Sequence, residues 1–494
     1  MAELRRFQML IDGKLVDAEG GKCFPSLNPA TGQPWALMPE ASEADVDRAV
    51  KAAHRAFMQG PWRKTTATER GKYLRRLADL VAARAEELGR IETIDTGKLF
   101  KETRWQANYV ADYYNFFAGL ADKISGETLP IDKPDMCVLT FREPLGVVAG
   151  IIPWNSQMFL SATKIGPALA AGNTIVLKAS EDAPAPLLEF GKLVLEAGIP
   201  EGVVNIVTGF GEPCGRALTT HPLVARIAFT GGDATARHIV RNSAENLARL
   251  SLELGGKSPV MVFEDADLES AANGVVSGIF GASGQTCVAG SRLYLQEKVA
   301  DKVLDALVDR ARQIRIGDPL DEATQMGPLA TQAQLTGIEA AMDEARRDNA
   351  QILHGGSRPA HLNAGWYYEP TIVDCENGDH AIAEKELFGP VLCAFRFKDE
   401  EEVVAKANDT RFGLAAGIFT RDVGRALRIS QATRAGIIWV NTYRMVSPIA
   451  EFGGMKDSGY GRESGVQAIY DYTCSKAVWI NTSTKPIANP FVMR

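Results

Sequence analysis

The chain has 494 residues, of which 46% are hydrophobic and 23% are charged, and its formal net charge is −7. This balance excludes a disordered chain, and the small acidic excess argues against a nucleic-acid partner or an anionic membrane surface. At about 100–200 residues per domain, the length predicts two to four domains.

The first third of the chain, after a short opening, has the pattern of helices. The segments Ser42-Glu-Ala-Asp45 and Thr66-Ala-Thr-Glu69 resemble capping boxes, which satisfy the free N–H groups at the start of a helix. Amphipathic stretches follow them at Val46–Phe57 and Tyr73–Ile91. We expect structural helices here and no chemistry.

From about residue 145, short β-rich runs alternate with helix-like stretches. The predicted strands are Val147–Ile152, Thr174–Lys178, Val203–Val207, Arg226–Thr230 and Pro259–Phe263. The predicted helices are Thr163–Ala171, Ala185–Ala197, Glu212–Thr220 and Ala234–Ala248. Apolar strands in alternation with helices indicate a parallel sheet that is covered on both faces.

The alternation resumes after residue 290, with predicted strands near Arg292–Leu295, Val391–Phe397 and Gly436–Asn441. Two α/β domains fit this pattern, with a boundary near Leu254-Gly-Gly-Lys257. No linker rich in proline and serine separates them, so we expect the two domains to pack closely.

Several predicted strands end in residues that suit a ligand. Lys178 and Glu181 follow one strand, Gly209-Phe-Gly211 a second and Thr230-Gly231-Gly232 a third. Ligands of open parallel sheets bind at the carboxyl ends of the strands, beside helix N-termini, so these residues indicate a nucleotide-type site. Tight turns without a ligand, and a solvated charged edge, remain the alternatives.

Cys287 stands out among the seven cysteines because small residues surround it, in Gly284-Gln-Thr-Cys287-Val-Ala-Gly. A substrate can reach such a thiol, whereas inert cysteines usually lie in apolar packing. Glu253 lies between two leucines before a glycine turn, and burial there would raise its pKa toward the range of a general base. A glutamate on an edge strand that faces solvent is the alternative.

The histidines and several missing motifs argue against other kinds of site and indicate the compartment in which the protein works. The six histidines lack an active-site signature and include no i, i+4 pair, which argues against a papain-like Cys/His pair and predicts no metal site. No C-x-x-C motif, apolar leader or apolar run of about 18 residues occurs. We therefore expect a cytoplasmic protein that makes no membrane contact.

Taken in order, these and further segments resemble the aldehyde dehydrogenase superfamily, in its NAD-dependent, non-acylating form, over nearly the full chain. Several matches are weak alone, but together in this order they are highly specific. The matching segments are Asn28-Pro-Ala-Thr-Gly32, Ile152-Pro-Trp-Asn155, Lys178 to Glu181, Phe229-Thr-Gly-Gly232, Glu253-Leu-Gly-Gly-Lys257, Gly284 to Arg292, Glu386-Leu-Phe-Gly-Pro390, Asn441-Thr-Tyr443, Phe452-Gly-Gly454 and Ser458-Gly-Tyr-Gly-Arg-Glu463.

The resemblance implies an α/β fold of three parts. A Rossmann-like parallel-sheet domain for the cofactor comprises residues 1–121 and 145–255, and a second α/β domain, residues 256–457, is catalytic. A small β oligomerisation element, residues 122–144 and 458–494, completes the neighbour's structure, so a homodimer or homotetramer is expected.

The resemblance also implies the catalytic residues. Cys287 matches the nucleophile that attacks the aldehyde to form a thiohemiacetal. The side-chain amide of Asn155 and the backbone N–H of Cys287 match the donors to the developing oxyanion. Glu253 matches the base that activates water for deacylation, and Glu463 resembles the second carboxylate of the family's proton path.

NAD is the cofactor that the resemblance implies. Lys178 and Glu181 match the contacts to the adenosine ribose, and Glu181 favours NAD over NADP because its carboxylate repels a 2′-phosphate. The remaining matches are Glu386 at the nicotinamide ribose, Phe388 beside the ring, Ile152 and Trp154 in the cleft, and Gly211, Gly231 and Gly232 in the turns. Gly232 replaces the usual serine and Ala236 the usual glycine, which removes side-chain contacts to the pyrophosphate.

Substrate residues follow from the same resemblance. Ser156 and Thr163 stand where many relatives carry aromatic residues, so we expect a wider tunnel than in enzymes for small aldehydes. Thr286, Val288, Val446 and Phe452 are expected to line it. Arg444 would suit a carboxylate or another anionic tail on the substrate, and an interface or surface salt bridge is its alternative.

The expected function is NAD-dependent oxidation of an aldehyde to the free carboxylic acid through a thiohemiacetal and a thioester. A CoA-acylating semialdehyde dehydrogenase is the first alternative, and Glu253 argues against it because acylating enzymes commonly lack this residue. A catalytically silent structural protein on the same scaffold is the second alternative. The presence of Cys287, Asn155 and Glu253 argues against that one.

Overall fold

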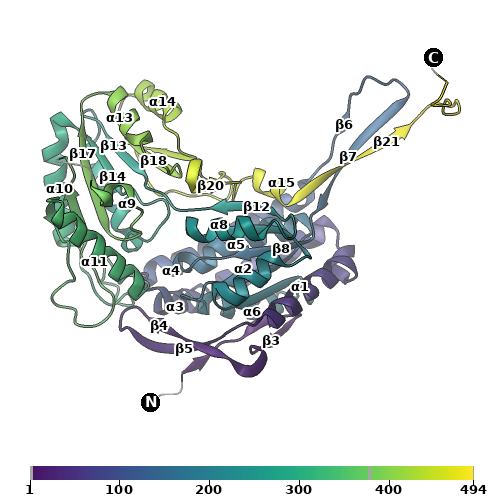
Figure 1. Cartoon of the computed structure of the whole chain (residues 1–494), viewed down its shortest axis with the longest axis horizontal. Helices are drawn as coiled ribbons and strands as arrows, with labels where there is room; N and C mark the ends of the chain where they lie inside the picture. Colours follow the sequence, from purple (N-terminus) through teal and green to yellow (C-terminus); the bar gives the residue numbers. More distant parts are fainter. Residues whose placement is uncertain (1–3, 377–379, 493–494) are drawn as a thin grey trace.

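The structure, a computed structural model, describes residues 4–376 and 380–492. Two large sheets with helices on their faces form the body of the molecule, and a narrow arm projects from it (Figure 1). Within the described residues, no helix combines the length and the apolar character needed to cross a membrane.

The first large sheet has eight strands in the order β20-β12-β11-β8-β9-β10-β2-β3. Their bounds are β2 (Met9–Ile11), β3 (Lys14–Val16), β8 (Val147–Ile151), β9 (Thr174–Ala179), β10 (Val204–Thr208), β11 (Val224–Thr230), β12 (Arg249–Glu253) and β20 (Gly459–Tyr460). The strands from β8 to β12 are parallel, as the alternation of strands and helices predicts. The chain runs from β8 to β9 and β10 on one side and then to β11 and β12 on the other. The strand order therefore reverses between β8 and β11, which is where such sheets bind ligands.

Helices cover both faces of this sheet. Their bounds are α1 (Glu43–Met58), α2 (Ala67–Ala83), α3 (Ala85–Thr96), α4 (Phe100–Leu120), α5 (Gln157–Ala171), α6 (Ala185–Glu196), α7 (Arg216–Thr220), α8 (Asp233–Asn242) and α15 (Gln467–Asp471). One apolar core holds the side chains of α2 to α6, and a second core on the other face holds those of α1, α7 and α8. Both predicted capping boxes, at Ser42 and Thr66, are present.

Four helices differ from the sequence-based expectation. Helix α5 begins at Gln157, ahead of the predicted start at Thr163. The predicted helix over Tyr73–Ile91 is two helices that meet at Arg84, and the second brings Gly89 against α4, where a Cβ would lie 2.8 Å from the Arg104 Cα. The stretch expected to be helical over Glu212–Thr220 begins instead as a π-helical turn, Gly211–Gly215. Helix α8 ends at Asn242 because the chain then turns through Leu247, whose φ is +55°, into β12.

The second large sheet has seven strands in the order β15-β16-β17-β14-β13-β18-β19, and only its edge strand β15 is antiparallel to its neighbour among the pairs described. Its strands are β13 (Pro259–Val262), β14 (Arg292–Gln296), β15 (Gln351–His354), β16 (Thr371–Asp374), β17 (Val391–Phe397), β18 (Ala415–Phe419) and β19 (Ile437–Val440). Its helices are α9 (Leu268–Phe280), α10 (Ala300–Gln313), α11 (Gln332–Arg347), α12 (Ala381–Glu384), α13 (Glu400–Asn408) and α14 (Val423–Ala432). The chain passes from the first sheet to the second between Glu253 and Pro259.

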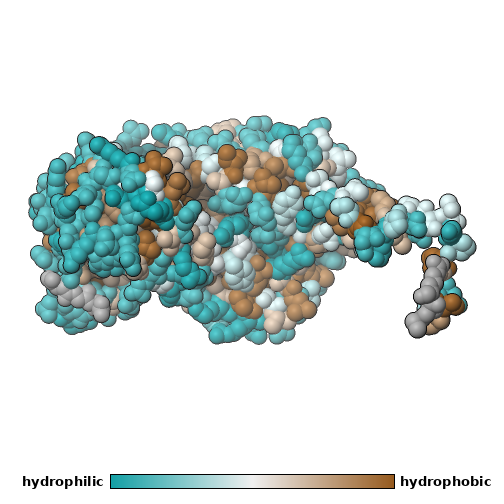
Figure 2. All heavy atoms as spheres, turned by 90° about the horizontal axis from the view of Figure 1, so that it is seen from above, coloured by the Kyte–Doolittle hydropathy of each residue, from teal (hydrophilic) through white to brown (hydrophobic). Residues whose placement is uncertain are grey.

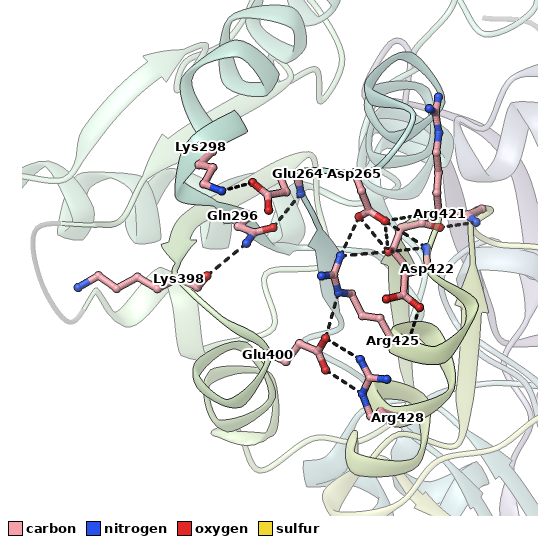
Figure 3. A network of polar contacts seen from close by, with 12 residues as sticks. Glu264, Asp265, Gln296, Lys298, Lys398, Glu400, Arg421, Asp422, Arg425 and Arg428 are labelled. Atoms are coloured by element: carbon pink, nitrogen blue, oxygen red, sulfur yellow. Dashed lines mark hydrogen bonds and ion pairs between the residues drawn. The ribbon is translucent and has the colours of Figure 1, made fainter.

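A polar network fixes α13 and α14 at the end of β13 (Figure 3). The Asp265 carboxylate accepts hydrogen bonds from the Thr420 hydroxyl at 2.9 Å and from the backbone N–H groups of Arg421 and Asp422 at 3.0 and 3.1 Å. Arg425 joins Asp265 to Glu400, which also binds Arg428. One carboxylate therefore holds the loop that starts α14.

Two smaller sheets complete the fold. The N-terminal sheet, which the sequence analysis passed over as a short opening, consists of β1 (Arg5–Arg6), β4 (Cys23–Asn28) and β5 (Gln33–Pro39). The arm consists of β6 (Thr128–Leu129), β7 (Met136–Pro144) and β21 (Thr473–Asn481). In the arm, β7 and β21 pair over nine residues, from Thr473 opposite Pro144 to Asn481 opposite Met136.

Candidate active site

A cavity of about 1300 Å³ opens at the carboxyl ends of the parallel strands of the first sheet and is lined by segments of both large sheets. Its wall includes the loop after β8, the turn after β11, the end of β12 and the loop before β14. The predicted site residues in the wall are Ile152, Trp154, Asn155, Ser156, Lys178, Glu181, Gly211, Gly231, Gly232, Glu253, Thr286, Cys287, Val288, Glu386, Phe388, Arg444, Val446 and Phe452.

Cys287 is half-buried in the loop between α9 and β14. The turn before it is tight, because Ala282, Ser283 and Gly284 all have positive φ. The Gly256 backbone lies so close that a Cβ there would be 2.7 Å from the Cys287 carbonyl oxygen. Burial raises the pKa of the Cys287 thiol to about 12, and the nearby carboxylates of Glu386 and Glu253 add to this rise. The thiol is therefore neutral until a base takes its proton.

Asn155 lies in a short 3-10 turn, Trp154–Ser156, directly after β8. Its Nδ2 donates a hydrogen bond to the carbonyl of Gln285 at 3.1 Å. Gln285 precedes Cys287 by two residues, so this bond ties the amide to the loop that carries the thiol. An amide nitrogen carries two N–H groups, so one remains for a ligand oxygen beside the thiol.

Glu253 is the last residue of β12 and is only 3% exposed. Neither of its carboxylate oxygens has a hydrogen-bond partner among the described residues. Burial raises the pKa of Glu253 well above its usual value, and the nearby Glu463 carboxylate raises it further. A buried carboxylate without partners is costly, and such groups are found mainly where chemistry needs them.

Glu463 lies behind the cavity wall, in a buried polar cluster. Lys164 forms an ion pair with its Oε1 and also donates to the Thr230 hydroxyl at 2.6 Å. The Thr163 hydroxyl donates to Glu463 Oε2 at 2.8 Å. The expectation that Thr163 lines a substrate tunnel is therefore not met, because its side chain faces this carboxylate instead.

One end of the cavity lies at the strand ends of the first sheet. Lys178, which is 4% exposed, donates from Nζ to Glu181 Oε2 at 3.2 Å and to the Ala179 carbonyl at 3.1 Å. Gly231 and Gly232 form the turn between β11 and the start of α8, and a Cβ at Gly231 would be 2.5 Å from the Phe229 ring. The backbone N–H groups at the start of α8 thus face the cavity from a glycine turn.

Glu386 and Phe388 lie between this end and the thiol. Glu386 Oε1 accepts the Gly256 N–H at 3.0 Å, and burial raises the pKa of this carboxyl to about 7. A Cβ at Gly255 would be 1.8 Å from Glu386 Oε2, so a larger residue there would displace this carboxylate. The Phe388 ring meets Trp154 edge-on, with centroids 5.3 Å apart.

The comparison with family models decides the affiliation. The model of the aldehyde dehydrogenase family matches residues 15–478. The chain belongs to this family. Its α/β fold is shared as well: the structure of an NAD⁺ complex of an aldehyde dehydrogenase from Bacillus cereus superimposes with a TM-score of 0.95 at 41% identity, covering 97% of each chain.

Curated relatives of this aldehyde dehydrogenase match over almost their whole lengths. A (Z)-2-((N-methylformamido)methylene)-5-hydroxybutyrolactone dehydrogenase of Acinetobacter baylyi is 54% identical over 99% of this chain and 100% of its own. A hydroxyisobutyraldehyde dehydrogenase of Mycolicibacterium austroafricanum is 41% identical over 97% of this chain and 94% of its own.

The other end of the dehydrogenase cavity has both apolar and polar walls. Thr286, Val288, Val446 and Phe452 line it near the thiol, together with Phe159 and Leu160 of α5. Ser156 and Arg444 are polar members of the same wall. Arg444 Nη1 donates to the Ser277 carbonyl at 2.9 Å, and no carboxylate of a described residue lies within 4 Å of it. The surface salt bridge that was one alternative is therefore not formed among the described residues, and the salt bridge at an interface stays a prediction.

Sequence reasoning missed three polar residues of this dehydrogenase. Lys164, which binds Glu463, is a lone charge in an otherwise apolar helix, and that contrast was a usable signal. Lys98 and Gln106 line the cavity beside Ser156. They flank the start of an amphipathic helix, where lysine and glutamine are ordinary, so no local signal marks them.

Proposed function

We propose that this chain oxidises an aldehyde to the free carboxylic acid with NAD as the hydride acceptor. The observation that carries the proposal is the convergence of three groups on one cavity: the Cys287 thiol, the Asn155 amide and the unpaired Glu253 carboxylate. A nucleophile, an oxyanion donor and a base are the parts that acyl chemistry on a thiol needs.

The wall of the cavity fits a dinucleotide. Its volume of about 1300 Å³ exceeds the roughly 300–1,000 Å³ of an ordinary small-molecule site. Lys178 and Glu181 offer a donor and an acceptor for the adenosine ribose, the start of α8 suits the pyrophosphate, and Glu386 suits the second ribose. Bound NAD supplies the hydride acceptor. Glu181 favours NAD because its carboxylate repels a 2′-phosphate.

In the first half of the reaction, Cys287 forms the covalent bond. After its proton is removed, the Cys287 sulfur adds to the carbonyl carbon, and the carbonyl oxygen becomes an oxyanion. Asn155 Nδ2 and the Cys287 backbone N–H donate to this oxyanion, and losing one such donor typically raises the barrier by about 2.7–4 kcal/mol. When the C–H bond breaks, its electron pair leaves as hydride, and the C=O bond of a thioester forms.

In the second half, Glu253 releases the product. Its unpaired carboxylate takes a proton from water, and the hydroxide oxygen attacks the thioester carbon. The C–S bond then breaks, with its electron pair on the Cys287 sulfur, and the acid is free. Glu463 and Lys164 lie next in line behind Glu253 and suit the onward passage of the proton.

Residues of the site argue against both alternatives. Transfer of the acyl group to CoA needs no water-activating base, so the buried Glu253 has no task in it. A silent structural protein has no use for a reachable thiol beside a free amide N–H. The relatives' names point to oxidation of carbonyl carbons, since a 5-hydroxybutyrolactone is the ring-closed form of a 4-oxo acid.

Two substitutions test the proposal. Cys287→Ala is expected to abolish NADH formation from every aldehyde in a broad panel, while NAD binding, followed by fluorescence titration, persists. Glu253→Gln is expected to give one rapid burst of NADH per site followed by turnover slowed about 10²–10⁴-fold, the usual contribution of a general base. NADH formation by Cys287→Ala, unchanged steady-state turnover by Glu253→Gln, or product released as acyl-CoA would each contradict the mechanism.

We also propose a homodimer or homotetramer that works in the cytoplasm. The arm leaves Phe141 and Trp479 about half exposed, and Figure 2 shows apolar side chains among polar ones along it. A second copy would cover them. All seven cysteines are free thiols in the structure, which suits a reducing compartment.

A further inference from the structure

The substrate end of the cavity carries an excess of positive charge. Lys98, Lys101 and Arg444 line it, whereas Glu102 is the carboxylate on the same wall. Lys101 lies on the rim, where its Nζ donates to the Thr324 carbonyl at 2.9 Å. Lys98 and Arg444 thus present the two cations nearest the interior of this end.

Lys98 is 5% exposed, yet its partners are neutral. Its Nζ donates to Gln106 Oε1 at 2.6 Å and to Ser156 Oγ at 2.9 Å. No carboxylate oxygen of a described residue lies within 4 Å of this ammonium group. An ammonium group has three N–H donors, so one is left for a ligand. A buried cation without a counter-ion costs free energy, which a bound anion would recover.

The carboxylates near Lys98 do not serve as that counter-ion. Glu92 is buried in α3 and forms no ion pair with Lys98 within 4 Å, and its two oxygens have no hydrogen-bond partner among the described residues. Burial raises the pKa of Glu92 to about 7, so near neutral pH it carries only part of a charge. Glu102 is half-buried, and its Oε2 is likewise unpartnered. Three basic side chains and the Glu102 carboxyl therefore line this end of the cavity.

Ser156 shares the cavity wall with Lys98. Its hydroxyl accepts a hydrogen bond from the ammonium group at 2.9 Å. A phenylalanine at 156 could accept no such bond. Ser156 also follows Asn155 directly, so the ammonium group binds the residue next to the one whose amide is assigned to the oxyanion.

We propose that this end of the cavity binds the carboxylate of a short oxo acid, with Lys98 as its main contact and Arg444 as a second cation. The inference rests on the proposed function, because it concerns the same aldehyde. The anion makes a charge-assisted hydrogen bond with the free N–H of Lys98, and Gln106 and Ser156 hold the ammonium group in place. Since Lys98 binds Ser156, the residue next to Asn155, we expect few carbons between the carboxylate and the aldehyde.

The test compares 4-oxobutanoate with its neutral methyl ester in the full-length enzyme. The readout is the ratio of the two kcat/KM values, which cancels any general loss of activity or folding. In the wild type we expect the acid to be preferred. In Lys98→Met the ratio is expected to fall about 30-fold or more, as when one partner of a charged hydrogen bond is removed, mainly through KM. In Lys98→Arg it is expected to recover in part.

Lys101→Met is the matched control. Lys101 lies three residues later, in the first turn of α4, so the substitution removes the same charge nearby but leaves the contacts of Lys98, and the ratio is expected to change less than about threefold. Arg444 lies on a loop, so Arg444→Gln provides a second test if Lys98→Met fails to fold. This substitution is expected to lower the ratio at least fivefold. A wild type without preference for the acid, or equal ratios in all variants, overturns the inference but leaves the proposed function standing. A wild type that forms no NADH with any of the aldehydes tested overturns the proposed function instead.

Discussion

At the scale of single residues, Glu253 shows a conflict between stability and chemistry. Its carboxylate is buried at the end of β12 without hydrogen-bond partners among the described residues, and its pKa is raised by that burial. Folding therefore becomes less favourable as this group loses its proton. The same lack of partners leaves both oxygens free to act as a base. A residue that only supported the fold would be expected to have its hydrogen bonds made.

This conflict predicts a stability effect of Glu253→Gln with a defined dependence on pH. The folded protein keeps the Glu253 proton to higher pH than the unfolded chain, so the wild type loses stability as the pH rises from about 5 through the folded pKa. Glutamine does not ionise. The melting temperature of Glu253→Gln minus that of the wild type is therefore expected to increase between about pH 5 and pH 8. A difference that stays constant or decreases in differential scanning fluorimetry would contradict the assignment of a raised pKa.

Sequence reasoning finds residues whose neighbours are unusual and misses those whose partners come from afar. Cys287 is visible because small residues surround it, and Glu253 because leucines flank it. Thr163 misleads for the opposite reason: its position in the helix suggests the tunnel, but its partner Glu463 is 300 residues away in the chain. No local pattern specifies which of two directions such a side chain takes.

At the scale of elements, local signals fix those helix boundaries whose partners lie close in the sequence and miss those that packing sets. The capping boxes at Ser42 and Thr66 are formed as predicted, because all their partners lie within four residues. The break at Arg84 depends on how closely Gly89 approaches α4, which is tertiary packing. Strand β20 is two residues long and is held by pairing with β12, so its own sequence could not reveal it.

The loop that starts α14 gives a prediction at this scale (Figure 3). Partial burial pushes the pKa of Asp265 upward, but hydrogen bonds from Thr420 and Arg421 outweigh it and hold the pKa below its usual value. Asp265→Ala leaves these donors unpaired, and we expect a loss of about 1–3 kcal/mol, or a few degrees in the melting temperature. Lys298→Met removes the exposed Lys298–Glu264 pair of the same region and is expected to cost about 0.5 kcal/mol or less. Equal effects of the two substitutions would contradict the role given to Asp265.

At the scale of the whole molecule, the site exists because two sheets meet. Asn155 and Glu253 come from the first sheet, at strands β8 and β12, and Cys287 from the loop before β14 of the second. The strand alternation predicts both sheets and the side on which ligands bind, since the carboxyl ends of parallel strands all lie on one side. It does not predict how closely the sheets approach. That distance is set by glycine contacts such as Gly256 against the Cys287 carbonyl, which only the folded chain displays.

The arm gives the prediction that concerns assembly. Strands β7 and β21 form most of a narrow sheet that projects from the body, and such a sheet needs an apolar face covered to be stable. Phe141 and Trp479 are 49% and 58% exposed, and the register of β7 and β21 places them on opposite faces of this sheet. We expect Phe141→Glu with Trp479→Glu to convert the oligomer to monomers in analytical ultracentrifugation and to lower the melting temperature. Val423→Glu changes a residue that is 73% exposed, on α14 at the far end of the molecule, and is expected to leave the assembly intact. A double variant that sediments like the wild type would show that another surface holds the copies together.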